Sequence, residues 1–337
     1  MPGIPHLMQA VVAEAPGGPL RLVQVSTPHP GPGQVLVRIA ASGVNPLDTK
    51  ILAGSADHAR QALPAILGLD MAGIVVGVGD GVTTYRQGDA VCGMIGGVGG
   101  HQGTLAEYVA ADASLLTRKP GNLTMRQAAA LPLVFITAWE GLVDRARVCA
   151  GQHVLVQGGA GGVGQMVLQI AKSFDAQVAA TGSPASRTAI ERLGAVFVDR
   201  GEPATETVAR LTGGQGFNIV YDTAGGASLD ASFTMVRRFG HVVSALGWGT
   251  HALAPLSFRA ASYSGVFTLL PLLTGEGRDH HGAILAEASR LAEAGQLVPA
   301  LDPHRFTLAT VGDAYRMIEA GTARGKIVVD LEQEIAP

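Results

Sequence analysis

Cysteine and charge are both scarce in this 337-residue chain. Its two cysteines, Cys92 and Cys149, are too few for a disulfide framework or a four-cysteine structural zinc site. Charged residues make up 15% and hydrophobic residues 47%, a balance that indicates a well-buried globular protein and argues against disorder. The net charge of −3 predicts no basic surface for nucleic acid.

Long apolar runs and a charged leader are also missing. The longest runs, such as residues 128–135, fall well short of a membrane span. The first residues show no charged segment followed by an apolar one, so no signal peptide is predicted. We therefore expect a cytoplasmic protein that engages neither membranes nor nucleic acid.

The length favours two domains, and the character of the sequence changes near residue 124. Before that point, residues 34–40, 72–78, 88–91 and 107–110 predict short strands separated by glycine and proline turns. Such closely spaced strands are typical of a small barrel or sandwich. The glycine-rich residues 93–103 predict a mobile loop.

Between residues 124 and 296, predicted strands alternate with helices. After a helix at residues 124–131, strands are expected at residues 154–157, 177–181, 196–199, 218–222, 240–245 and 262–268. This alternation indicates a parallel sheet covered on both faces. Residues 297–337 return to strand-like sequence, so we expect them to rejoin residues 1–123 in the first domain.

Glycine is abundant, with 46 residues, and one cluster has a special context. The stretch VLVQGGAGGVG joins a predicted buried strand to a predicted helix, and Gly159, Gly161 and Gly164 fit the pattern G-x-G-x-x-G. These glycines permit a tight turn, close approach of a pyrophosphate and close helix–sheet packing, respectively. A dinucleotide site is therefore predicted, with a plain tight turn as the alternative. Its residues are Gly159, Ala160, Gly161, Gly162, Val163 and Gly164.

The identity of the dinucleotide depends on the end of the second strand. NAD sites usually place a carboxylate there, but this chain has Thr181, Gly182 and Ser183. Arg187 and Arg200 follow nearby, and a 2′-phosphate requires hydroxyl donors and a cation. NADPH is therefore predicted, although Arg187 could instead be a solvated helix residue.

Several strings resemble the medium-chain dehydrogenase/reductase superfamily, in particular its zinc-free quinone oxidoreductase (zeta-crystallin-like) branch. In order, they are SGVNPLDTKILAG, LPAILGLDMAGIVVGVGDGV, QGTLAEYV, AAALPLVFITAW, VYDTAGG and GTARGKIVVD, together with the glycine turn. The resemblance implies an α/β fold in which a GroES-like small β-barrel catalytic domain joins a Rossmann doubly wound parallel-sheet cofactor domain. It also implies a homodimer, paired through the sheet edge near residues 262–272.

No metal is expected. Where zinc-dependent relatives carry a cysteine and a histidine ligand, this chain has Asn45 and Leu69. Neither side chain can take those places, and a catalytic zinc needs about three protein ligands.

The resemblance places Asn45 near the nicotinamide and the substrate, where its amide could donate a hydrogen bond to a developing oxyanion. A turn-forming role before Pro46 is the alternative. Asp48 could orient Asn45 or cap a helix, and His101 is a possible proton donor or a solvated loop residue.

Further cofactor contacts are expected beyond the carboxyl ends of the strands, where open parallel sheets bind ligands. These residues are Ala224, Ala245, Leu246, Gly247, Val266 and Phe267. The resemblance adds Thr137, with a buried helix hydroxyl as the alternative, and Arg324 and Lys326, with surface charge as the alternative.

Together, these features predict a zinc-independent NADPH-dependent reductase of quinones or α,β-unsaturated carbonyls that acts by direct hydride transfer. Two alternatives stay open. The first is an enoyl-thioester reductase, although the first domain shows no obvious lysine and arginine cluster for a carrier phosphate. The second is a non-catalytic NADPH-binding protein with a structural or sensor role.

Overall fold

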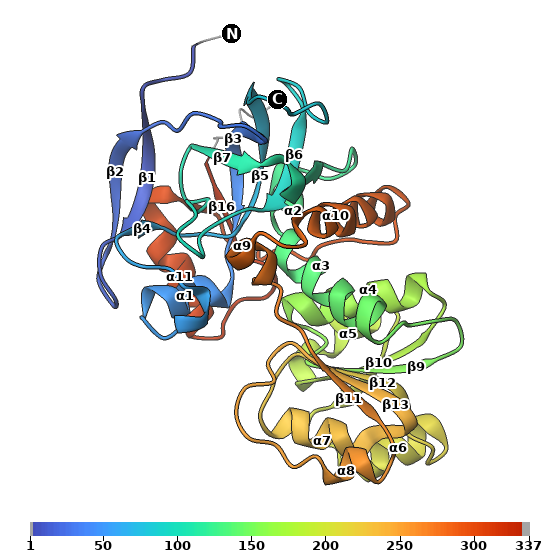
Figure 1. The fold of residues 1–337 in the computed structure, drawn as a ribbon. Helices are drawn as coiled ribbons and strands as arrows, with labels where there is room; N and C mark the ends of the chain where they lie inside the picture. The colour runs from blue at the N-terminus through green and yellow to red at the C-terminus, as the bar shows by residue number, and fades with distance from the viewer. Residues whose placement is uncertain (1–2, 332–337) are drawn as a thin grey trace. The chain divides into compact units, whose positions relative to one another are not determined.

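A computed structural model describes residues 3–331. This part of the chain divides into two compact units. Unit 1 contains the residues up to 133 and from 269 onward, and unit 2 contains residues 134–268. The expected α/β fold class is confirmed, because unit 1 is rich in strands and unit 2 is built on a parallel sheet covered by helices (Figure 1).

Unit 1 contains two sheets. The smaller has the strand order β2-β1-β4, and the larger has the order β15-β16-β3-β5-β6-β8, with β7 also paired to β3. The strands are β1 (Leu7–Ala13), β2 (Leu20–Ser26), β3 (Gln34–Gly43), β4 (Ala65–Ile66), β5 (Asp70–Val78), β6 (Ala90–Met94), β7 (Tyr108–Asp112), β8 (Leu116–Arg118), β15 (Phe306–Thr307) and β16 (Val328–Asp330). The α-helices are α1 (Pro46–Leu52), α2 (Met125–Ala129), α9 (Leu270–Thr274), α10 (Arg278–Glu293) and α11 (Val311–Glu319). Short 3₁₀ turns are η1 (Asp57–Ala59), η2 (Ala113–Leu115) and η5 (Leu308–Thr310).

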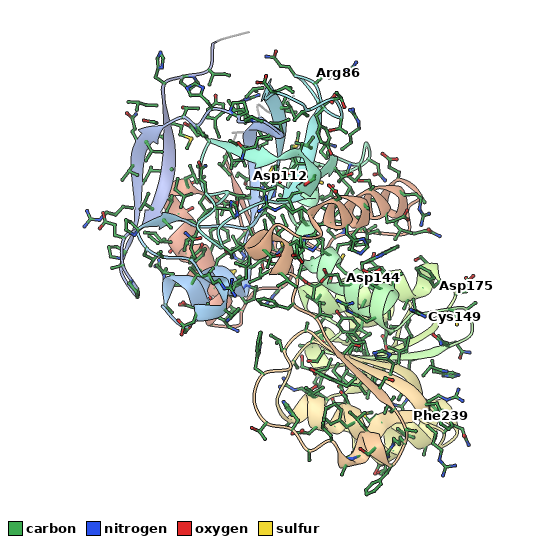
Figure 2. All side chains as sticks on the ribbon, viewed as in Figure 1. Arg86, Asp112, Asp144, Cys149, Asp175 and Phe239 are labelled. Atoms are coloured by element: carbon green, nitrogen blue, oxygen red, sulfur yellow. The ribbon has the colours of Figure 1, made fainter. Side chains whose placement is uncertain are left out.

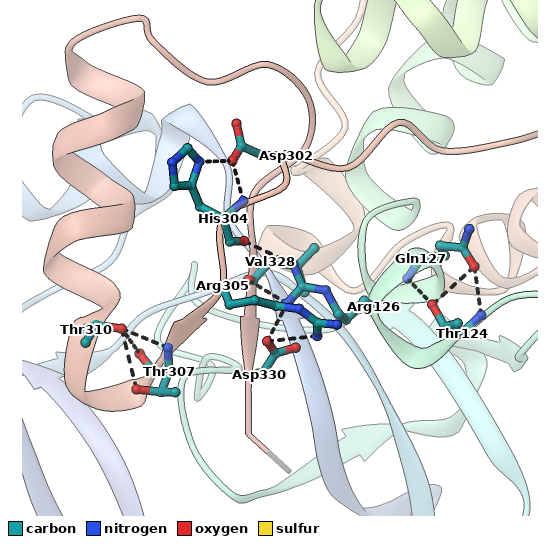
Figure 3. A network of polar contacts seen from close by, with 10 residues as sticks. All are labelled: Thr124, Arg126, Gln127, Asp302, His304, Arg305, Thr307, Thr310, Val328 and Asp330. Carbon is teal, nitrogen blue, oxygen red and sulfur yellow. Dashed lines mark hydrogen bonds and ion pairs between the residues drawn. The ribbon is translucent and has the colours of Figure 1, made fainter. Parts of the chain in front are cut away.

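The last described strand of the chain is held in unit 1 by a largely buried ion pair. The Arg126 guanidinium binds the Asp330 carboxylate, and it also donates to the backbone carbonyls of Val328 and His304 (Figure 3). Since β16 also pairs antiparallel with β3, the C-terminal segment completes the larger sheet.

Unit 2 contains six parallel strands in the order β11-β10-β9-β12-β13-β14. The strands are β9 (His153–Gln157), β10 (Gln177–Gly182), β11 (Val196–Asp199), β12 (Phe217–Asp222), β13 (Val236–Ser244) and β14 (Ser262–Gly265). The helices are α3 (Pro132–Trp139, which begins in unit 1), α4 (Gly162–Ser173), α5 (Arg187–Arg192), α6 (Ala204–Thr212), α7 (Ala227–Met235) and α8 (Ala254–Ser257), with turns η3 (Glu140–Arg145) and η4 (Pro184–Ser186). In Figure 1, α4 and α5 cover one face of the sheet, and α6, α7 and α8 cover the other.

The strand order of unit 2 is that of the doubly wound dinucleotide-binding fold, which reverses between β9 and β12. Its core is apolar and continuous, with Leu155, Val220, Phe233 and Val242 among its fully buried members. β14 forms the edge of the sheet, as expected, although it ends at Gly265, before residue 268. Pairing through this edge stays a prediction.

The unit boundaries differ from residues 124 and 296. Helix α2 packs in unit 1 because its alanines, Ala128 and Ala129, lie in one apolar cluster with Ala41 and Ala72 of β3 and β5. Helix α10 also belongs to unit 1, where the carbonyl of Ala292 accepts from Asn122 Nδ2 at 2.7 Å. Helical periodicity alone does not indicate which sheet a helix covers.

The glycine-rich residues 93–103, which the sequence predicts to be a mobile loop, are instead partly buried and closely packed. Gly93 and Met94 end β6, and residues 95–98 are buried. A Cβ atom on Gly96 would lie 1.9 Å from the carbonyl oxygen of Gln102. Here glycine permits close packing of two backbone segments, which composition does not distinguish from an open loop.

The cysteines are free: Cys92 is buried, and Cys149 is exposed on the surface of unit 2 (Figure 2). Within residues 3–331, no helix has both the length and the apolar character needed to cross a membrane.

Candidate cofactor and active site

The glycine turn connects β9 to α4, as the motif predicts. Gly158 adopts a left-handed φ of 82°. A Cβ atom on Gly159 would lie 2.3 Å from the Ala180 side chain, and one on Gly164 would lie 2.2 Å from the Gly158 carbonyl oxygen. The protein's own packing therefore requires glycine at 159 and 164. Gly161 is different, because its added Cβ would meet only the Gly158 oxygen, at 3.4 Å.

Two neighbouring strands hold the turn in place. The Thr181 hydroxyl accepts from the backbone N–H of Gly158 at 3.0 Å and donates to Gln157 Oε1 at 2.8 Å. Directly after β12, the Thr223 hydroxyl donates to the Gln157 carbonyl at 2.6 Å. Since the first turn of a helix leaves backbone N–H groups without helical partners, the start of α4 offers donors to an anion.

A cavity of about 650 Å³ opens beside this turn, over the carboxyl ends of β9, β10, β11 and β12. Its volume lies within the range of small-molecule sites. The predicted residues that line it are Ala160, Gly161, Thr181, Gly182, Ser183, Arg200 and Ala224. Other lining residues, not predicted, include Gln157, Asp199, Glu202, Thr223 and Ser228.

The two candidate arginines are placed differently. Arg200 lines the cavity. Arg187 lies with its guanidinium 4.2 Å from the Phe197 ring centre and pairs with Glu191 at 3.3 Å, and it does not belong to the cavity lining. Asp199 also lines the cavity, and its Oδ1 accepts from the backbone N–H of Gly201.

A buried carboxylate organises the residues beyond β12 and β13. Asp222 is fully buried and accepts from the backbone of Gly225 at 3.0 Å and from the Ser244 hydroxyl at 2.8 Å. Ser244 in turn accepts from the backbone of Leu246 at 3.0 Å. Ala224, Gly225, Ala245 and Leu246 thus lie in loops fixed by Asp222 and Ser244.

The remaining predicted residues of unit 2 lie near β14. The Tyr263 side chain packs against Gly247. A Cβ atom added to Gly247 would lie 2.0 Å from the Tyr263 hydroxyl. Val266 donates from its backbone to the Ser244 carbonyl at 3.0 Å, and the Phe267 ring packs edge-on against Trp248. Thr137 is buried, and its hydroxyl contacts that of Thr268 at 3.0 Å.

In unit 1, a buried polar cluster forms around Asn45 at the start of α1. We define this Asn45 cluster as Asn45, Asp48, Asp70 and Lys326. Asn45 Nδ2 donates to Asp70 Oδ2 at 2.9 Å, and its backbone N–H donates to Asp48 Oδ2 at 2.7 Å. Lys326 Nζ donates to Asn45 Oδ1 and lies 3.4 Å from Asp70 Oδ2. Asp70 Oδ1 accepts from the backbone of Leu133 at 2.9 Å.

Burial dominates the electrostatics of this cluster. It raises the pKa of Asp48 to about 7, against the opposing backbone hydrogen bond from Asn45 and the Lys326 charge. Burial also raises the pKa of Asp70 and lowers that of Lys326, while their mutual attraction opposes both shifts. Asp48 Oδ1 and the Tyr315 hydroxyl are buried without a hydrogen-bond partner among the described residues.

The donor set of the Asn45 cluster does not suit zinc. It contains two carboxylates, but an amide and an ammonium supply the other polar atoms, and the ammonium already provides the positive charge that a metal would bring. Across residues 3–331, no group of three or more histidine, cysteine, aspartate or glutamate side chains is placed to hold a metal ion.

The other predicted residues of unit 1 have different surroundings. His101 Nε2 lies 3.1 Å from the carbonyl oxygen of Leu272 and 3.3 Å from the Arg278 guanidinium. The backbone N–H of Arg324 donates to Asp302 at 2.8 Å.

Sequence reasoning missed Asp70, Asp222, Ser244 and Tyr315 as contributors. A charged residue inside an apolar strand, as in LGLDMAG, signals Asp70 as a buried polar group that needs partners. The ends of β12 and β13 offer the same signal for Asp222 and Ser244. Nothing local in the sequence distinguishes Tyr315 from an ordinary core tyrosine.

Comparisons with known proteins agree with this architecture. Residues 31–121 match the alcohol dehydrogenase GroES-like domain, and residues 193–329 match the zinc-binding dehydrogenase family. A 2-methylene-furan-3-one reductase of Solanum lycopersicum is 35% identical over 318 residues, which cover 90% of this chain and 74% of the relative. A chloroplastic NADPH-dependent alkenal/one oxidoreductase of Arabidopsis thaliana is 34% identical over 337 residues, covering 97% of this chain and 80% of the relative.

A crystal structure of an alcohol dehydrogenase superfamily protein from Novosphingobium aromaticivorans has a TM-score of 0.95 and 56% sequence identity. The match covers 96% of this chain and 100% of that one. The chain therefore belongs to the medium-chain dehydrogenase/reductase superfamily, among relatives of the enone and quinone reductase type. It is a member of an oxidoreductase family with a GroES-like domain and a Rossmann sheet.

Proposed function

We propose that this protein is an NADPH-dependent reductase that transfers a hydride directly to α,β-unsaturated carbonyls or quinones, without zinc. The observation that carries the proposal is the cavity beside the glycine turn, at the point where the strand order of unit 2 reverses. The names of the two plant relatives, a 2-methylene-furan-3-one reductase and an alkenal/one oxidoreductase, support the choice of substrate class.

The protein's own groups have distinct tasks in this reaction. The turn at Gly161 and the start of α4 bind the pyrophosphate, and NADPH, when bound, supplies the hydride. Ser183 and Arg200 line the cavity, and in this proposal they hold the 2′-phosphate. Asn45 retains one amide N–H for a substrate oxygen, because the other is used by Asp70.

The direct test is NADPH oxidation by protein that has been treated with EDTA. An alkenal and an ortho-quinone are offered in parallel, and absorbance of the reduced nicotinamide is followed. We expect turnover of at least one substrate, at a rate that added zinc does not raise. Tight NADPH binding without turnover of either would contradict the proposal, and it would favour an enoyl-thioester substrate or a non-catalytic role.

We expect Arg200→Ala to weaken NADPH binding by about 30-fold and to leave NADH binding nearly unchanged. The loss corresponds to one charge-assisted hydrogen bond of roughly 2 kcal/mol. Fluorescence titration with each nucleotide measures the effect.

Arg187→Ala is the matched comparison, because this arginine begins α5 after the neighbouring strand β10 and stacks on Phe197 outside the cavity lining. A selective loss of NADPH affinity in Arg187→Ala alone would move the 2′-phosphate to that side chain. Tighter binding of NADH than of NADPH by the parent protein would exclude the NADPH assignment.

A further inference from the structure

Lys326 is the cation of the Asn45 cluster, and its position is fixed by two partners. Its side chain is only 9% exposed, and its ammonium donates to Asn45 Oδ1 and lies 3.4 Å from Asp70 Oδ2. An ammonium has three N–H donors, so these contacts leave a third donor without an acceptor among the described residues. The cluster thus presents a positively charged donor whose direction is set by its neighbours.

Asn45 is oriented by the same contacts. Its carbonyl oxygen points to Lys326, and its amide nitrogen points to Asp70. A neutral amide is the weaker electrophile of the pair, because hydrogen bonds from charged donors are roughly twice as strong as neutral ones. Asn45 therefore has two roles: its carbonyl oxygen positions Lys326, and its amide can also bind a ligand.

Two carboxylates act on the Lys326 ammonium. Asp70 on β5 contacts it directly, and Asp48 on α1 acts on it through space. Tyr315 on α11 is related to Asp48, because burial and then the Asp48 carboxylate raise the pKa of its hydroxyl. Because Asp70 contacts the ammonium directly, at 3.4 Å, whereas Asp48 acts on it only through space, Asp70 is the main counter-ion of the ammonium. A single contacting carboxylate leaves the ammonium able to stabilise another negative charge. That charge is the one that develops on the substrate oxygen.

We propose that Lys326 is the electrophile and proton donor of the reaction, a catalytic residue that binds the carbonyl oxygen of the unsaturated substrate. This proposal rests on the proposed function. The hydride forms the new C–H bond at the β-carbon, the electron pair of the C=C bond shifts to the bond between the α-carbon and the carbonyl carbon, and the C=O pair moves onto oxygen. That oxygen takes a proton from Lys326, giving an enol that tautomerises to the saturated carbonyl. Lys326 regains its proton from water, and NADPH is oxidised as the C=C bond is reduced.

The test compares Lys326→Met with the double variant Lys326→Met/Asp70→Asn and with Lys326→Arg. The single variant leaves the Asp70 carboxylate buried without its cation, so a loss of activity there could arise from damaged folding. The double variant removes both charges and restores a neutral cluster. Melting temperature, NADPH dissociation constant and kcat for the alkenal or quinone are measured for each.

We expect kcat to fall by about 100-fold or more in both methionine variants, within the usual range for a lost general acid. The double variant should melt close to the parent protein and bind NADPH within about threefold of it, and Lys326→Arg should recover part of kcat. Recovery of kcat in the double variant would show that Lys326 is only structural. A large rise in the NADPH dissociation constant with kcat preserved would make it a cofactor contact. Both results would overturn the proposal, whereas a parent protein that turns over neither substrate would overturn the proposed function itself.

Discussion

Gly161→Ala is expected to leave folding intact and to weaken NADPH binding about a hundredfold, a loss of about 2.7 kcal/mol. The backbone of Gly161 has φ −70° and ψ 166°, which any residue can adopt, and an added Cβ meets only one atom, at 3.4 Å. The new methyl group would instead occupy the space through which a pyrophosphate approaches the turn. Nucleotide titration and thermal melting measure the two effects separately.

Gly164→Ala is the informative contrast, because its Cβ would meet the backbone of Gly158 at 2.2 Å. Backbone cannot move aside as a flexible side chain can, so we expect a loss of stability of about 3 kcal/mol or more. Gly312→Ala, on α11, serves as the control, because its added Cβ would meet only the Arg316 guanidinium, at an ordinary contact distance of 3.6 Å. Unchanged NADPH affinity in Gly161→Ala would place the pyrophosphate away from this turn.

Asp48→Asn is expected to stabilise the protein at alkaline pH and to do so progressively less as the pH falls. The pKa of Asp48 is about 7 in the folded protein, whereas an unperturbed aspartate has a pKa of 3.8. Between these two values the unfolded chain ionises at Asp48 while the folded protein keeps the proton, so folding stability falls as the pH rises and the loss is complete above about 7. Asparagine does not titrate and keeps an oxygen that can accept from the backbone of Asn45.

The gain in unfolding free energy of Asp48→Asn over the parent protein should grow by roughly 3 kcal/mol between about pH 5 and pH 8, since each pKa unit is about 1.4 kcal/mol. Chemical denaturation at several pH values measures it. Asp57→Asn, which alters an exposed carboxylate at η1, is the control and should show no such trend. A gain that does not change with pH would mean that Asp48 is ionised throughout this range.

The parts of the fold that depend on local patterns could be predicted from the sequence. The apolar runs and the glycine turn identified each strand of unit 2, because strand, turn and helix signals there involve neighbouring residues. The start of β13 at Val236 was not predicted, since Arg237, Arg238 and Phe239 are exposed and carry no buried-strand pattern. The assignment of α2 and α10 to unit 1 also requires knowledge of which sheet they cover.

The candidate site likewise has a part that local sequence predicts and a part that depends on long-range contacts. The glycine turn was predictable because its constraints lie within one short stretch of chain. Asn45 was singled out, but its partners Asp70 and Lys326 meet it only through the pairing of β3 with β5 and with β16. Such contacts depend on strand register, which no single stretch of sequence specifies.

The division of unit 1 between the two ends of the chain has a consequence for the order of assembly during synthesis. Unit 2 is one continuous segment, so all of its strands are available before the part of unit 1 that runs from residue 269 to the C-terminus has been made. Asn45 and Asp70 are synthesised early, yet the lysine that binds them follows Asp70 by 256 residues. The cation of the Asn45 cluster thus arrives after all of unit 2 has been made, and until then Asn45 must stay solvated and Asp70 must stay solvated or protonated.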